Sequence, residues 1–313
     1  MKQMKIVVLN EGSSDSRVSA SPETVKKINE MHHDVYVQKG AGVGSNFTDH
    51  EYEENGASIF EDKNVIRGAD VIFKVNKPSA DEIETFKENS ILIGALDPFN
   101  NPDLIENLKN KKIIAFAMEL MPRITRAQSM DILSSQSNLA GYKAVIIASK
   151  LFGKAFPMMM TAAGTIAPAK VMVFGAGVAG LQAIATAKRL GAIVSATDVR
   201  LAAKEQVESL GGKFIMVESD ELKDSETSGG YAKEMSEEFK IKQAELISQT
   251  LSSQDIVICT ALIPGKKAPI LISEDQVKSM KPGSIIIDLA SENGGNCECS
   301  IAGEIVSING VLV

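Results

Sequence analysis

The stretch VMVFGAGVAGLQAIATAKRLGAIVSATDVR, residues 171–200, decides the fold. An apolar run leads into the pattern G-x-G-x-x-G at Gly175, Gly177 and Gly180, a helical stretch of small residues follows, and the next apolar run ends at Asp198. In such a unit the first glycine permits a tight turn, the second lets a pyrophosphate approach the backbone, and the third lets helix and strand pack closely. The amide groups at the helix N-terminus face the phosphates. The stretch therefore predicts a strand–helix–strand unit that binds a dinucleotide.

The carboxylate of Asp198 indicates which dinucleotide is bound. It lies 18 residues past Gly180, where an acid accepts hydrogen bonds from the adenosine ribose and repels the extra 2′-phosphate of NADP. Arg200 argues in the other direction, because an arginine can accommodate that phosphate. We predict NAD(H); the alternative at this point is a glycine-rich turn that binds no nucleotide.

Short apolar strands alternate with helical segments along the rest of the chain. Ser21 and Pro22 predict the start of a helix, and Asn309–Gly310 predicts a hairpin turn. Strands separated by helices at this rhythm form parallel sheets covered by helices. We predict an α/β protein with two Rossmann-like doubly wound parallel-sheet domains and a cleft between them. The N-terminal domain is expected over residues 1–126, a connecting helix and linker over 127–160, and the nucleotide-binding domain over 161–313.

Composition excludes several other classes of protein. The 313 residues carry a net charge of -7 without a basic stripe, so nucleic acid is not an expected partner. The 3 cysteines and 3 histidines argue against a disulfide framework and a metal site, and they favour a reducing compartment. No apolar run is long enough to span a membrane.

Longer motifs point to a family. The stretch FAMELMPRITRAQSMDILSSQSNLAGY, residues 116–142, resembles the NAD(H)-binding component of proton-translocating NAD(P) transhydrogenase. The stretches FPMMMTAAGT, GVAGLQAIATAKRLGA, AAKEQVESLGGKF, GGYAKEM and ALIPGK resemble the same component, so the resemblance covers nearly the whole chain. The wider family includes alanine dehydrogenase, which has the same two-domain architecture.

The resemblance implies an activity and its partners. Such components are homodimers that hold NAD(H) between their two domains. They exchange hydride with NADP(H) on a partner component, in a Re/Si-specific reaction that transmembrane components couple to proton translocation. The resemblance places the chain in the cytoplasm, peripheral to the inner membrane through these partners. Members of the family continue past the equivalent of Val313 with helices that return to the first domain.

The resemblance also implies site residues. Arg123, Gln128, Asp131 and Ser134 lie in the loop that places the nicotinamide, and we treat them as the catalytic set. The other interpretation of that loop is an interdomain ion pair that fixes a hinge. Tyr231 lies in a flap that closes over the nucleotide. The predicted cofactor-binding set is Gly175, Gly177, Val178, Ala179, Gly180, Asp198, Val199, Arg200, Tyr231, Ala261 and Leu262.

Two other functions stay open. An alanine dehydrogenase needs an acid–base group at its substrate carbon, and this chain has no histidine after His50. Arg17 and Lys74 resemble substrate-binding positions of that enzyme. We interpret them as inherited scaffold, with Arg17 paired to an acid and Lys74 a surface charge at a strand end. The third possibility is a nucleotide-binding module without catalysis.

Two further groups of residues carry structural expectations. The three methionines at 158–160 are expected to pack in a core as flexible apolar residues. Cys259 is expected to be a small buried residue on a strand. The acidic segment 219–245 is either a solvated surface loop or a mobile flap.

Overall fold

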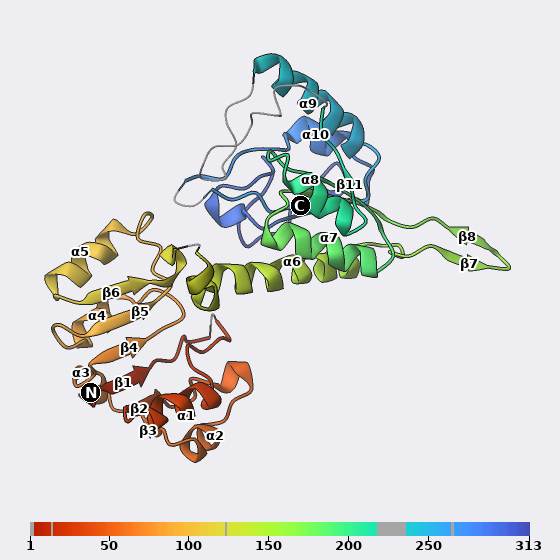
Figure 1. Cartoon of the computed structure of the whole chain (residues 1–313). Helices are drawn as coiled ribbons and strands as arrows, with labels where there is room; N and C mark the ends of the chain where they lie inside the picture. The colour runs from red at the N-terminus through yellow and green to blue at the C-terminus, as the bar shows by residue number, and fades with distance from the viewer. Residues whose placement is uncertain (1–2, 14, 123, 218–235, 264–265) are drawn as a thin grey trace. The chain divides into compact units, whose positions relative to one another are not determined.

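The computed structural model describes residues 3–13, 15–122, 124–217, 236–263 and 266–313. The chain divides into two compact units, Met1–Ile132 and Leu133–Val313 (Figure 1). The segment that we expected to act as a connector, residues 127–160, therefore falls mostly within the second unit. Its helix, α6 (Ile132–Leu151), belongs to the packed core of that unit.

The first unit contains one six-stranded sheet in the order β3-β2-β1-β4-β5-β6. All of its strand pairs are parallel. The strands are β1 (Lys5–Val8), β2 (Asp34–Gln38), β3 (Ser58–Phe60), β4 (Val71–Phe73), β5 (Ile91–Gly94) and β6 (Ile114–Ala117). This order places the topological switch point between β1 and β4, at the carboxyl ends of the strands.

Helices form between these strands where the sequence supplies caps. The side chains of Ser21, Thr48 and Ser79 each accept a hydrogen bond from a first-turn amide, and Thr48 and Ser79 form complete capping boxes. The helices are α1 (Pro22–Glu30), α2 (Asp49–Glu54), α3 (Asn64–Arg67), α4 (Ala80–Thr85) and α5 (Pro102–Asn110), with 3-10 turns η1 (Val43–Ser45), η2 (Met118–Leu120) and η3 (Thr125–Met130). Val7 and Val8 of β1 lie in two separate apolar clusters, because successive strand residues point to opposite faces. The sheet is thus buried on both faces.

The second unit contains a seven-stranded sheet in the order β11-β10-β9-β12-β13-β15-β14. The strands are β9 (Lys170–Phe174), β10 (Ile193–Thr197), β11 (Lys213–Phe214), β12 (Ile256–Cys259), β13 (Ile285–Asp288), β14 (Ser307–Ile308) and β15 (Val311–Leu312). All pairs are parallel except β14 with β15, which form the predicted hairpin. Asn309 and Gly310 make its turn with φ values of 50° and 78°. The predicted doubly wound α/β fold is confirmed in both units.

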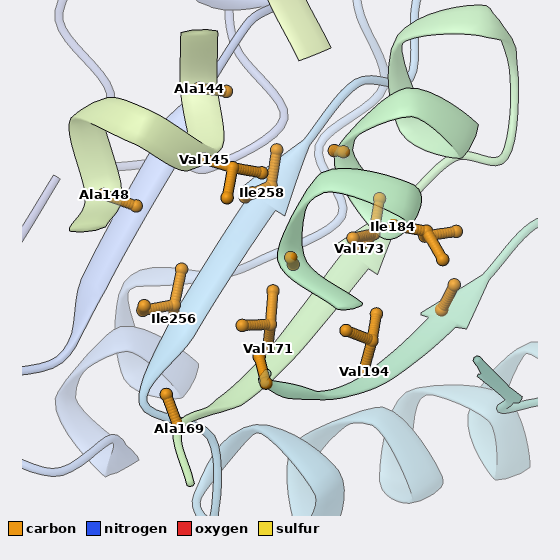
Figure 2. Close-up of a cluster of buried hydrophobic side chains, with 14 of the residues drawn as sticks. Ala144, Val145, Ala148, Ala169, Val171, Val173, Ile184, Val194, Ile256 and Ile258 are labelled. Atoms are coloured by element: carbon orange, nitrogen blue, oxygen red, sulfur yellow. The ribbon is translucent and has the colours of Figure 1, made fainter. Parts of the chain in front are cut away.

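Helices cover both faces of this sheet. On one face, α6, α7 (Val178–Arg189) and α8 (Ala203–Ser209) pack over β9, β10 and β12, in the cluster that Figure 2 shows around Val145, Val171 and Ile258. On the other face, α9 (Glu237–Leu251) and α10 (Glu274–Ser279) contribute Leu251 and Val277 to a second core. The 3-10 turn η5 (Ser291–Asn293) follows β13. Cys259 is fully buried on β12, as predicted.

The methionine prediction is wrong. Residues 158–160 do not pack in a core; they lead into and form strand β7 (Met159–Thr161), which pairs antiparallel with β8 (Gly164–Ile166). Figure 1 shows this hairpin projecting from the second unit. Met158, Met159 and Met160 are 58%, 48% and 74% exposed. A run of apolar residues in the sequence does not distinguish a core segment from an apolar arm.

Candidate functional site

The glycine-rich turn connects strand β9 to helix α7 at the carboxyl edge of the second sheet. Gly175 follows the last residue of β9 and has a φ of 90°, which other residues rarely adopt. Gly177 is the N-cap of α7 and gives that helix no side-chain cap. Helix α7 has 12 residues, so its first-turn amides and its dipole together favour an anion at this end.

The three glycines differ in what surrounds them. A Cβ atom on Gly180 would overlap the carbonyl oxygen of Gly175, and a Cβ on Gly175 would lie 2.8 Å from Oγ1 of Thr260. No atom lies within 4 Å of the position that a Cβ on Gly177 would take. Gly175 and Gly180 are therefore required by the packing of the protein itself. Gly177 instead leaves open space over the backbone, as a bound pyrophosphate requires.

Asp198 follows strand β10, and its carboxylate has several donors. Its Oδ2 accepts hydrogen bonds from the amide of Ala176 at 2.7 Å and from Nη2 of Arg200 at 3.1 Å. Its Oδ1 accepts hydrogen bonds from the amide and Nε of Arg200 at 2.8 and 3.0 Å. The Asp198 side chain is only 6% exposed. The predicted ribose acceptor thus ties the β10 loop to the glycine-rich turn.

A third loop at this edge is fixed by residues that the sequence analysis did not single out. Oγ1 of Thr260 donates to the carbonyl oxygens of Phe174 and Gly175, both at 3.0 Å. The fully buried Asn296 accepts from the amide of Ala261 and donates to its carbonyl oxygen, both at 2.9 Å. The signal that could have found Thr260 is its position directly after a parallel strand.

Asn296 is held in turn by Asp288, the last residue of β13. Oδ2 of Asp288 accepts from the amide of Asn296 at 2.8 Å and from Oγ of Ser300 at 2.6 Å. Asp198 and Asp288 therefore play similar structural parts, each at the carboxyl end of a strand and each accepting backbone amides from a neighbouring loop. Their shared position was a signal in the sequence that we used only for Asp198.

Apolar side chains stand exposed around this edge. Val178, Val199 and Leu262 are 41%, 63% and 50% exposed, and they lie just after β9, β10 and β12 in the chain. Three of the predicted cofactor-binding residues thus offer apolar surface on the loops that surround the glycine-rich turn. Such surface suits the flat face of an adenine ring, because ligand pockets combine mostly apolar walls with a few polar groups.

Helix α6 packs against the start of α7. A Cβ atom on Gly141 would overlap the carbonyl oxygen of Ala179, so the two helices are in backbone contact there. Ser134 lies on α6 seven residues before Gly141, which is about two turns, or roughly 10 Å along the helix axis. The structure thus places one residue of the predicted nicotinamide loop on the helix that contacts the glycine-rich turn.

The rest of the predicted nicotinamide loop belongs to the first unit. Gln128 lies in η3 and is exposed, and its carbonyl oxygen accepts from the amide of Asp131 at 3.2 Å. Arg123 and Tyr231 lie outside the described residues. The structure gives no test of the contacts between this loop and the nucleotide-binding unit.

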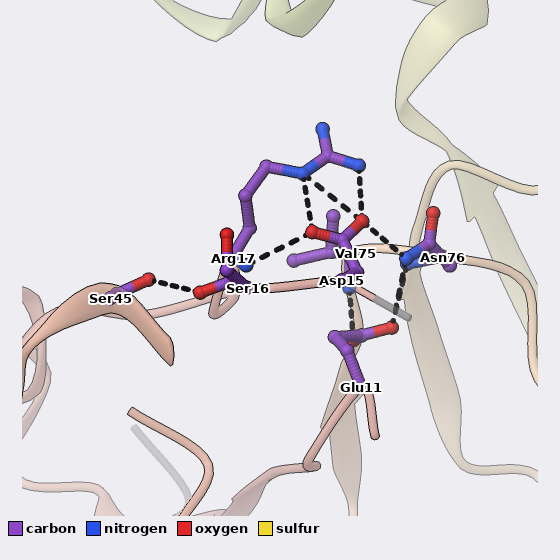
Figure 3. A network of polar contacts seen from close by, with 7 residues as sticks. All are labelled: Glu11, Asp15, Ser16, Arg17, Ser45, Val75 and Asn76. Atoms are coloured by element: carbon purple, nitrogen blue, oxygen red, sulfur yellow. Dashed lines mark hydrogen bonds and ion pairs between the residues drawn. The ribbon is translucent and has the colours of Figure 1, made fainter. Parts of the chain in front are cut away.

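At the switch point of the first sheet, a network of polar side chains joins the loops after β1 and β4 (Figure 3). Glu11 accepts hydrogen bonds from the amides of Val75 and Asn76, at 2.6 and 3.1 Å. The Asn76 side chain donates to Asp15 at 2.8 Å, and Asp15 pairs with Arg17 at 2.6 Å. The Arg17 hydrogen bond holds the pKa of the Asp15 carboxyl well below its usual range.

Lys74 does not lie at the surface, and this corrects the sequence interpretation. It is 7% exposed, and its ammonium group pairs with Oε1 of Glu82 at 2.7 Å. The pairing is expected, because a buried ammonium group needs a partner. Arg17 is paired with an acid, as we expected. Each cation therefore already has a carboxylate from its own unit.

Metal and membrane features are absent from the described parts of the chain. These residues contain no group of three or more His, Cys, Asp or Glu side chains that could hold a metal ion. None of the helices that the structure describes is long and apolar enough to cross a membrane. Burial raises the pKa of the Cys297 thiol to about 11, so it stays protonated at neutral pH and does not act as a thiolate nucleophile.

Comparison with known proteins agrees with this geometry. Residues 7–140 match the N-terminal domain and residues 144–313 the C-terminal domain of the alanine dehydrogenase/PNT family. An NAD(P) transhydrogenase alpha subunit from Rhodospirillum rubrum is 56% identical over 317 residues, which cover 99% of this chain and 83% of that protein.

A solved structure and a second relative complete the comparison. The crystal structure of transhydrogenase from Sinorhizobium meliloti matches with a TM-score of 0.90 and 50% identity, over 98% of this chain and 84% of that one. The alanine dehydrogenase of Methanococcus maripaludis is 32% identical, over 91% of this chain and 71% of that protein. The similarity is thus greater to transhydrogenase subunits than to this dehydrogenase.

Proposed function

The chain belongs to the alanine dehydrogenase/PNT family, and from this premise we propose that it is the NAD(H)-binding component of a proton-translocating NAD(P) transhydrogenase. It passes hydride between its own NAD(H) and NADP(H) on a partner component. The observation that carries the proposal is the glycine-rich turn, which is open over Gly177 and uncapped at α7. Identities of 56% and 47% to transhydrogenase alpha subunits, against 32% to an alanine dehydrogenase, support the choice of reaction.

The residues divide the work of binding. The amides around Gly175, Gly177 and Gly180 hold the pyrophosphate, together with the first turn of α7. Asp198 accepts the adenosine ribose, and the exposed apolar residues around it, Val178, Val199 and Leu262, contact the adenosine. Arg123, Gln128, Asp131 and Ser134 place the nicotinamide, and Tyr231 lies in the flap that closes over the nucleotide.

The proposed reaction needs positioning more than acid–base catalysis. The bound cofactor supplies the hydride, and transfer between two nicotinamide rings neither consumes nor releases a proton at the reacting carbons. The protein has to hold the ring at near-contact distance with the correct face exposed and water excluded. A chain without histidine after His50 is suited to that task. The Re/Si specificity that we propose follows from which face of the ring is held toward the partner.

Partners complete the proposed assembly. An NADP(H)-binding component accepts or donates the hydride, and transmembrane components couple it to proton movement, so this chain is peripheral to the inner membrane on the cytoplasmic side. We also propose a homodimer. The exposed methionines at 158–160 on the β7–β8 hairpin support it, because soluble chains seldom expose adjoining apolar residues that contact nothing.

Alanine dehydrogenase activity is the second candidate, and the first unit argues against it. A substrate carboxylate would have to compete with Asp15 for Arg17 and with Glu82 for Lys74. The Lys74–Glu82 pair is costly to break because it is buried. A module that binds NAD(H) without catalysis is the third candidate.

A mixing assay separates the three candidates. The chain is combined with a purified NADP(H)-binding transhydrogenase component, and reduction of an NAD analogue by NADPH is followed. We expect exchange only in the mixture. NADH oxidation by the chain alone with pyruvate and ammonia would identify a dehydrogenase. NADH binding without exchange would identify a binding module.

A further inference from the structure

The contacts of Asp198 raise a question about how a ribose reaches it. A carboxylate offers about four lone-pair sites to hydrogen-bond donors. Two backbone amides, of Ala176 and Arg200, and two guanidinium nitrogens of Arg200 donate to the two oxygens of Asp198 at 2.7–3.1 Å. The acceptor that the proposed function assigns to the ribose is therefore already saturated in this structure.

The four donors are not equally replaceable. The amides of Ala176 and Arg200 belong to the turns after β9 and β10, and moving them would distort both turns. The Arg200 side chain is 36% exposed, and it carries the two remaining donors on a flexible stem. A ribose diol also brings two donors. The guanidinium can therefore be exchanged for the diol without changing the backbone.

We propose that Arg200 is a latch on Asp198, whose guanidinium occupies the ribose-binding oxygens until the nucleotide displaces it. This inference rests on the proposed function, since it concerns how NAD(H) enters that site. The exchange keeps the buried carboxylate compensated in both states, which matters because a buried charge without partners is strongly destabilising. It also lowers the affinity for NAD(H), because the ribose gains its hydrogen bonds only by ending those of Arg200.

The latch predicts an unusual response to substitution. Arg200→Lys keeps the positive charge but loses the planar fork that bonds both oxygens. We expect it to bind NADH at least threefold more tightly than the wild type, and Arg200→Met to change in the same direction. Arg189→Lys, at the opposite end of α7, is the matched control and should leave the affinity unchanged. A residue that binds the nucleotide directly would give the opposite result.

A second measurement isolates the ribose. Wild type and Arg200→Lys are compared for binding of ADP and 2′-deoxy-ADP by calorimetry. In the wild type the 2′-hydroxyl replaces an existing bond and gains little, so the preference for ADP is small. In Arg200→Lys we expect that preference to increase at least threefold. A merely structural role for Arg200 would weaken both ligands equally.

The outcomes separate this proposal from the function on which it rests. Wild-type protein that binds no NADH would overturn the proposed function and the latch together. Wild-type protein that binds NADH, with Arg200→Lys binding it equally or more weakly, would overturn the latch alone. Tighter NADH binding and a larger ribose preference in Arg200→Lys would establish the latch.

Discussion

At the scale of single residues, Asp198 has a structural part and a proposed binding part. Asp198→Asn keeps the size of the side chain but removes its charge and half of its acceptor capacity. We expect NADH affinity to fall about tenfold, or about 1.4 kcal/mol. This is the lower end for hydrogen bonds to a charged group, because the ribose only replaces the bonds of Arg200. Titration of NADH fluorescence measures the change, and unchanged affinity would show that the ribose binds elsewhere.

Gly177 and Gly180 are a matched pair that separates binding from folding. Gly177→Ala places a methyl group in open space at a φ of -77°. We expect its melting temperature to equal that of the wild type and its NADH affinity to fall at least tenfold, about 1.4 kcal/mol, since the methyl group blocks the pyrophosphate. Gly180→Ala meets the Gly175 carbonyl oxygen and should be destabilised by about 1–3 kcal/mol. Equal NADH affinities for Gly177→Ala and wild type would contradict the proposed pyrophosphate position.

Asp15 gives a prediction of pH dependence in the first unit. Its pKa is lowered from an ordinary 3.8, mainly by the Arg17 hydrogen bond, so the folded state binds its proton less readily than the unfolded state. The contribution to stability is therefore fully present at neutral pH and declines as the pH falls below about 3.8. Urea unfolding of wild type and Asp15→Asn should differ at pH 7 and converge toward pH 2. A difference that is constant with pH would mean that the ion pair does not stabilise the fold.

At the scale of elements, the contact of α6 with α7 connects the nicotinamide loop to the pyrophosphate turn. Gly141→Ala would push its methyl group into the Ala179 carbonyl oxygen and separate the helices. We expect a loss of about 1–3 kcal/mol in stability and weaker NADH binding, because the start of α7 moves. Gly153→Ala is the control, since no atom lies within 4 Å of its added methyl group. Both effects are measured on one sample by melting with and without NADH.

The elements also show how far sequence reasoning reached. The doubly wound sheets followed from short apolar runs that alternate with capped helices, and the hairpin at Asn309–Gly310 followed from its turn residues. The place of α6 did not follow, because a helix that joins two domains and one that packs in a core can have the same periodicity. The methionines failed for a related reason: exposure depends on tertiary packing, which the local sequence does not encode.

At the scale of the whole molecule, the candidate site could be predicted only where one local motif carries it. Gly175, Gly180 and Asp198 lie within a single strand–helix–strand unit, so their spacing indicates their positions. Asn296 and Asp288 act on the Ala261 loop from far along the chain, and no spacing rule connects them. The Arg200 fork on Asp198 is a matter of side-chain conformation, and the sequence suggested only that the residue was near the ribose.

The β7–β8 hairpin carries the prediction that belongs to the assembly. Met160 is 74% exposed on the hairpin, and Met31 is 62% exposed at the end of α1, so the two residues form a matched pair. If the hairpin packs against a second copy, Met160→Lys buries a charge in that interface and shifts the dimer toward monomer, while Met31→Lys does not. Neither substitution should change the melting temperature of the monomer, because neither side chain packs in a core. Light scattering over a dilution series gives the mass, and a dimer that persists in Met160→Lys at every concentration would place the interface on another surface.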